Sequence, residues 1–109
     1  MIKIVQLSDI HIRNYGRYEE YEEVFNRLYE TLKIEKPNII CNLGDTFDQF
    51  IDISNEAKLQ AGNFLNNLTL YCDEVIVVVG PDDNRKRNLK RINSIETIVK
   101  LINNPKIKY

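Results

Sequence analysis

The sequence predicts an α/β fold in which a mainly parallel sheet is covered by helices. Three short apolar runs, rich in Ile and Val and bounded by turn residues, occupy residues 2–7, 38–43 and 75–79. Such runs are typical of parallel strands that are buried on both faces. Segments with helical spacing follow each run, and this alternation favours right-handed crossovers. We therefore expect a three-layer α/β/α arrangement with the element order βαβαβα(β).

The three predicted helices differ in their signals. Over residues 18–36, apolar side chains recur at spacings of three and four, and acidic residues fill the first turns, as the helix dipole favours. Residues 55–71 repeat the apolar spacing, and Ser54 is in position to cap that helix. A shorter helix is expected over residues 94–103. Residues 106–109 predict the start of a fourth strand.

Length and composition indicate a single domain that spans residues 1–109 and has one modest core. No apolar run approaches the roughly 20 residues that span a bilayer, and no charged-then-apolar leader opens the chain. Cys41 and Cys72 have neither metal-site spacing nor the density of a disulfide scaffold. We therefore expect reduced thiols in an intracellular protein, cytoplasmic or nuclear, with no membrane partner.

Acidic residues follow each of the three predicted strands. Because the carboxyl ends of parallel strands meet at one edge of a sheet, we expect these residues to share a crevice. A carboxylate oxygen and an imidazole nitrogen two residues apart suit a divalent transition metal. Each cluster taken alone could instead be a helix cap or a turn. The clusters are Asp9 with His11, Asp45 with Asp48, and Asp82 with Asp83.

Two of these clusters resemble motifs of a known family. The stretches LSDIH at 7–11 and GDTFD at 44–48 are similar to the first two motifs of the calcineurin-like metallophosphoesterases. The short GDxFD form and GRYEEYEEVFNRL at 16–28 are most similar to the DNA double-strand-break-repair nucleases of the SbcD type. The resemblance covers the whole chain but less than half of a family catalytic domain. It implies the amino-terminal half of a metallophosphoesterase fold.

The resemblance also implies a chemistry. In the family, two metal ions, usually Mn²⁺ and alternatively Mg²⁺, hold a hydroxide that attacks a phosphodiester. Asp9 and His11 would bind the first ion, Asp45 would bridge both ions, and Asp48 would have a supporting role. The implied protein is a DNA-repair hydrolase, an exo- or endonuclease, with DNA as its substrate and an SMC-like coiled-coil ATPase as its partner. A homodimer is left open.

The third family motif is altered in this chain. Residues 80–83 read GPDD where the family has Gly-Asn-His-Asp or Gly-Asn-His-Glu. Pro81 offers no side-chain ligand in place of the metal-binding Asn, and an ionised Asp82 is unable to donate a proton in place of the catalytic His. Asp83 retains the acidic residue at the end of the motif and would have a supporting role. Because His11 is the single histidine, we expect at most one weakly bound ion and a chain that is inactive or nearly so.

A basic cluster follows this altered motif. Residues 85–109 hold eight of the 15 Lys and Arg residues and one of the 16 acidic residues. We expect the cluster either to contact nucleic-acid phosphates or to form a solvated helix face. Charge alone favours the solvated face, and the resemblance to nucleases makes the two roles equally expected. The residues concerned are Arg85, Lys86, Arg87, Lys90 and Arg91.

Asn42 is unexpected within the apolar run IICNL at 39–43. A buried amide without partners costs about 1–3 kcal/mol, so this side of the strand is expected to reach a polar edge. With Pro81 and Asp82, Asn42 points to a decayed site or to an altered version of an active parent.

Two other classes of function remain open. KPNIICNLGD at 36–45 resembles the strand of a response-regulator receiver that carries the phospho-accepting Asp, although receivers place more elements before that strand. The chain could also be a catalytically inactive fragment that is retained for protein contacts.

Overall fold

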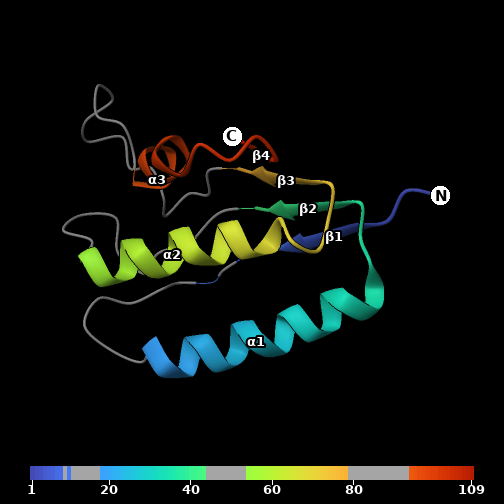
Figure 1. The fold of residues 1–109 in the computed structure, drawn as a ribbon, viewed down its shortest axis with the longest axis horizontal. Helices are drawn as coiled ribbons and strands as arrows, with labels where there is room; N and C mark the ends of the chain where they lie inside the picture. Colours follow the sequence, from blue (N-terminus) through green and yellow to red (C-terminus); the bar gives the residue numbers. More distant parts are fainter. Residues whose placement is uncertain (9, 11–17, 44–53, 79–93) are drawn as a thin grey trace.

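Four strands and three helices alternate in the part of the chain that the structure describes (Figure 1). The computed structural model describes residues 1–8, 10, 18–43, 54–78 and 94–109. The elements are β1 (Ile4–Leu7), α1 (Tyr18–Glu35), β2 (Ile39–Asn42), α2 (Asn55–Leu68), β3 (Glu74–Val77), α3 (Ser94–Ile102) and β4 (Ile107–Lys108). The predicted order βαβαβα(β) is confirmed, including the short fourth strand near the end of the chain.

The ends of the helices follow from the local sequence. Ser54 caps α2 as predicted, because its Oγ accepts a hydrogen bond of 3.2 Å from the backbone N–H of Ala57. Lys36 and Asn103, directly after α1 and α3, take positive φ angles of 49° and 50°. A left-handed residue turns the chain out of a helix, and the proline within the next two residues of the sequence keeps the helix from resuming.

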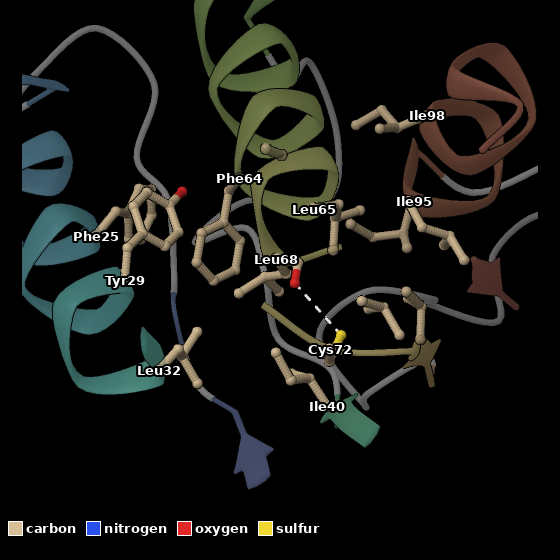
Figure 2. Close-up of a cluster of buried hydrophobic side chains, with 14 of the residues drawn as sticks. Phe25, Tyr29, Leu32, Ile40, Phe64, Leu65, Leu68, Cys72, Ile95 and Ile98 are labelled. Carbon is tan, nitrogen blue, oxygen red and sulfur yellow. Dashed lines mark hydrogen bonds between the residues drawn. The ribbon is translucent and has the colours of Figure 1, made fainter. Parts of the chain in front are cut away.

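The four strands form one parallel sheet in the order β1-β2-β3-β4. Each strand is added beside the previous one in the same direction, so right-handed connections put successive helices on the same face. Figure 2 shows α1, α2 and α3 side by side on that face, above the core. This order differs from the 2-1-3-4-5 order of a receiver, in which the first strand is internal. The sheet therefore does not support the receiver alternative.

Burial differs between the two faces of the sheet. Ile40 and Val75 are fully buried beneath the helices, whereas Ile39 and Cys41 on the other face are only partly buried. Ile4, at the start of β1, is 53% exposed. The α/β class and the parallel sheet are thus confirmed, but the expected burial of the strands on both faces is not observed. The described helices form one layer on the sheet, because the strand order places them all on one face.

The core lies between the helices and the sheet (Figure 2). Phe25 of α1 stacks on Phe64 of α2 with ring centroids 4.3 Å apart, and Tyr29 lies 6.4 Å from the same Phe64 ring. Aromatic pairs of this kind contribute about 0.5–1.5 kcal/mol beyond the area that they bury. Leu65 and Leu68 on the same side of α2 are completely buried. The aromatic cluster therefore fixes α1 against α2 on top of the strands.

The outer surface of α1 is charged. Arg27 lies 2.7 Å from Glu23, and Lys33 lies 2.9 Å from Glu30, all with exposed side chains. Exposed pairs of this kind contribute at most about 1 kcal/mol each, so they favour solubility of the helix face more than stability. Among the helices in the described ranges, none combines the length and the apolar character needed to cross a membrane.

Candidate functional site

Three strands end at the same level of the sheet. Leu7 of β1, Asn42 of β2 and Val77 of β3 are direct neighbours in the strand register. The ladder closes one step later, where Leu43 N–H donates to Leu7 O at 2.7 Å and Val78 N–H donates to Asn42 O at 2.8 Å. The segments that carry the three sequence motifs therefore leave the sheet from one edge, as the sequence predicted.

The helices begin at this same edge. Each helix runs back against the strand before it, so the starts of α1 and α2 lie on the side toward which the strand arrows point (Figure 1). Tyr18 opens α1 and Ser54 caps α2, and the Tyr18 hydroxyl lies 3.1 Å from Ser54 Oγ in a hydrogen bond. In the sequence, Tyr18 comes seven residues after His11, and Ser54 comes six residues after Asp48. The bond thus joins the two chain segments that return from the first and second motifs.

Gln60 extends this contact into a buried polar cluster. Its side chain is 6% exposed, and its Nε2 donates to the backbone O of Tyr18 at 2.9 Å and to Glu22 Oε1 at 3.2 Å. We call Tyr18, Glu22, Ser54 and Gln60 the helix-start cluster. It holds the first turns of α1 and α2 together by hydrogen bonds, in addition to the aromatic packing farther along the same helices.

The helix-start cluster was only partly visible in the sequence. Ser54 was predicted as a cap, but its hydrogen bond to Tyr18 was not, because the two residues are 36 positions apart. Gln60 offered a signal, since it falls on the apolar stripe of α2 between Ala57 and Phe64, where a polar side chain needs a buried partner. A polar residue on a buried helix stripe is therefore the feature that could have identified the cluster.

Asn42 is completely buried at the last position of β2. Its side chain lies on the same face of the sheet as that of Ile40, beneath the helices, and two residues before Gly44 of the second motif. Asn42 stands in the final register pair, at the carboxyl end of β2. That its side of the strand reaches a polar edge stays a prediction, because residues 44–53 lie outside the described residues. Asn42 is thus the last buried residue of β2 before the second motif begins at Gly44.

The residues predicted to perform the chemistry lie outside the described residues. Within the described ranges, no three His, Cys, Asp or Glu side chains are grouped as metal ligands. The metal site therefore stays a prediction, and what the structure supplies is its platform of strand ends and helix starts. The residues concerned are Asp9, His11, Asp45, Asp48, Pro81, Asp82, Asp83, Arg85, Lys86, Arg87, Lys90 and Arg91.

The two cysteines are free, as expected. Cys72 is buried beyond the end of α2, where its Sγ donates to the backbone O of Leu68 at 3.3 Å (Figure 2). Burial raises the pKa of the Cys72 thiol, which disfavours the reactive thiolate. Cys41 lies on the face of the sheet that the helices do not cover. Cys72 is therefore a structural residue and has no nucleophilic role.

Comparison with known proteins identifies the family of this chain. Over 99 residues, the chain is 34% identical to "Uncharacterized protein R555" of Acanthamoeba polyphaga mimivirus. The match takes in 88% of the chain but only 7% of the viral protein, so the chain spans a small part of that relative's length. The family model described as calcineurin-like phosphoesterase matches residues 2–106. A match of nearly the full length, on a sheet whose first three strands deliver the motifs to one edge, shows that the chain belongs to the calcineurin-like phosphoesterase family.

Proposed function

We propose that this chain is the amino-terminal part of a metal-dependent phosphodiesterase that acts on DNA. The observation that carries the proposal is the match to the calcineurin-like phosphoesterase family over residues 2–106, since it supports a phosphoesterase function. The first three strands end at the same level, at Leu7, Asn42 and Val77. This supports the proposal, because motifs that are far apart in the sequence then begin at neighbouring strand ends.

The proposed metal ligands are Asp9, His11 and Asp45. Two carboxylates and one imidazole are hard or borderline ligands that suit Mn²⁺ or Mg²⁺ and leave positions for water. A bound ion would supply an activated water for attack at phosphorus. Asp48 and Asp83 would support the ligands by accepting hydrogen bonds from their neighbours.

The chain by itself is proposed to be inactive or nearly so. Pro81 brings no ligand where the family has Asn, and Asp82 brings no proton donor where the family has His. One histidine in 109 residues also leaves a second ion without nitrogen ligands. We therefore expect one weakly bound ion at most and no measurable hydrolysis.

DNA is the proposed substrate of the longer parent protein. The cluster Arg85, Lys86, Arg87, Lys90 and Arg91 would neutralise backbone phosphates, which gives affinity without base recognition. A nuclease of the repair type would work with an SMC-like coiled-coil ATPase in the cytoplasm or nucleus. These assignments concern the whole protein, of which the chain covers a small part if the parent resembles the viral relative in length.

Calorimetric titration with MnCl₂ tests the metal proposal. We expect one weak site in the natural chain, and we expect Asp9→Ala and Asp45→Ala each to abolish it. Asp73→Ala is the matched control, because Asp73 is an exposed acid just before β3, at the opposite edge of the sheet. Loss of the site in the Asp73 variant, or its survival in both of the others, would contradict the assignment.

Hydrolysis is tested separately with the same proteins. We expect no cleavage of single- or double-stranded DNA in the presence of Mn²⁺. Cleavage by the natural chain that disappears in Asp45→Ala would show that the chain is active as it stands. That result would refute the proposed inactivity while supporting the proposed ligands.

A further inference from the structure

The chain segments that carry the first two motifs are joined to each other on both sides of the motifs. Before the motifs, at the ends of β1 and β2, Leu43 N–H donates to Leu7 O at 2.7 Å. After the motifs, at the starts of α1 and α2, the Tyr18 hydroxyl lies 3.1 Å from Ser54 Oγ. Because both segments begin and end at linked positions, the two motifs have fewer arrangements relative to each other than segments that are linked at one end only.

Gln60 is a buried polar residue that the stability of α2 does not explain. It is 6% exposed and falls on the apolar stripe between Ala57 and Phe64. Its Oε1 is buried and has no hydrogen-bond partner among the described residues. A buried polar atom in this state destabilises a protein, and an apolar side chain of similar size would avoid that cost. Departures of this kind from the best packing are expected at functional sites.

Gln60 supplies a fixed position for the start of α1. Its Nε2 donates to the backbone O of Tyr18 at 2.9 Å and to Glu22 Oε1 at 3.2 Å. One side chain of α2 thus holds the backbone at the point where the chain returns from the first motif. The Tyr18 hydroxyl then reaches Ser54, at the point where the chain returns from the second motif.

We propose that Gln60, Tyr18 and Ser54 are positioning residues for the predicted metal site. They hold the two motif segments at the spacing at which the ligands of the first motif and Asp45 of the second can share one ion. The inference rests on the proposed function, because it takes the ligands from there. Polar groups behind metal ligands raise affinity by orienting those ligands. Here the orientation acts through the ends of the segments that carry the ligands.

Manganese affinity and stability, measured on the same variants of the 109-residue chain, test the proposal. Gln60→Leu changes no charge, removes the unpartnered oxygen and extends the apolar stripe. Glu22 is exposed and Tyr18 is half-buried, so water can replace the donor that they lose. We therefore expect the urea midpoint of Gln60→Leu to equal or exceed that of the natural chain. Its dissociation constant for Mn²⁺, measured by calorimetric titration, should rise at least about fivefold.

Tyr18→Phe and Asn67→Leu complete the set. Tyr18→Phe removes the hydroxyl that meets Ser54 and should also raise the dissociation constant at least about fivefold. Asn67→Leu is the matched control for Gln60→Leu, because Asn67 is an amide on α2 that donates to α1, at the Tyr29 hydroxyl, 3.5 Å away. It lies at the other end of α2, away from the motif segments, and should leave the Mn²⁺ affinity unchanged.

Each outcome separates the positioning role from the proposed ligands. Unchanged Mn²⁺ affinity in Gln60→Leu or in Tyr18→Phe overturns the positioning role and leaves the proposed ligands intact. A loss of affinity that Asn67→Leu shares, or that accompanies a lower urea midpoint in Gln60→Leu, shows a general effect of helix packing and overturns the role as well. A natural chain that binds no Mn²⁺ refutes the proposed ligands themselves, and the positioning role is refuted with them.

Discussion

Replacement of Ser54 by Ala tests whether the helix-start cluster holds α1 and α2 together next to the predicted site. Ser54 Oγ accepts a hydrogen bond from Ala57 N–H at 3.2 Å and lies 3.1 Å from the Tyr18 hydroxyl. Loss of the cap should destabilise the protein by about 1 kcal/mol. Loss of the partly buried partner of Tyr18 should add about 1 kcal/mol. We therefore expect Ser54→Ala to lower the free energy of unfolding by about 2 kcal/mol.

A double-mutant cycle separates the two contributions. Tyr18→Phe removes only the hydroxyl and should cost about 1 kcal/mol. If the two side chains share one hydrogen bond, the double variant should lose about 2 kcal/mol instead of the sum of about 3, which is a coupling energy of about 1 kcal/mol. Tyr71→Phe is the matched control, because the Tyr71 hydroxyl makes no hydrogen bond to the described residues and its ring contact with Tyr29 is kept.

Urea denaturation followed by circular dichroism measures all four proteins of the cycle and the control. With a slope of about 2 kcal/mol per M, a loss of 2 kcal/mol lowers the midpoint by about 1 M. Additivity of the single variants within about 0.3 kcal/mol would refute the inference that Tyr18 and Ser54 are bonded. A Tyr71→Phe variant as unstable as Tyr18→Phe would show that hydroxyl loss has a general effect on this protein.

Further expected outcomes concern stability and thiol reactivity, each read by urea denaturation unless stated otherwise. Gly62→Ala should stabilise by about 0.5–1 kcal/mol, since alanine favours a helix interior and its Cβ meets only ordinary contacts, and destabilisation would show that α2 and α3 are closer than described. Lys36→Gly should stabilise by about 0.5–1 kcal/mol because it removes a side chain from a positive φ of 49°, and no gain would argue against that conformation. Phe64→Ala should destabilise by about 3–5 kcal/mol because the ring is buried against Phe25, and a loss below 1 kcal/mol would contradict that packing. Because burial raises the pKa of Cys72 above its ordinary value of 9.0, the unfolded chain loses the thiol proton first, so this residue's contribution to stability should fall as the pH rises above about 9 and persist below it. An absorbance assay with a disulfide reagent should show Cys72 protected until unfolding, and rapid labelling of this residue in the native state would refute its burial.

The element order could be predicted because the signals that set it are local. Apolar runs gave the strands, three-and-four spacing gave the helices, and Ser54 marked the start of α2 through the short reach of its own side chain. The family could also be predicted, since LSDIH at 7–11 and GDTFD at 44–48 are contiguous motifs and the family match confirms what they indicate. The nuclease branch, the metal and the partners stay proposals.

Pairings between distant residues could not be predicted in the same way. Two hydrogen bonds depend on how α1 and α2 lie against each other. One joins Tyr18 to Ser54, and in the other Gln60 donates to the backbone O of Tyr18. The sequence contains both ends of each contact but no local interaction that joins them.

The amino-acid sequence alone determined the α/β class, the helix and strand positions and the family, because each depends on periodicity, capping or a contiguous motif. The tertiary structure decided which face of the sheet is covered. The sequence of a short apolar strand such as residues 39–42 does not reveal whether one or both of its faces are buried. No single segment of the sequence determines the order of the strands in the sheet. Only the sequential order of the strands, combined with right-handed connections, placed every described helix on one face and brought α2 and α3 into contact.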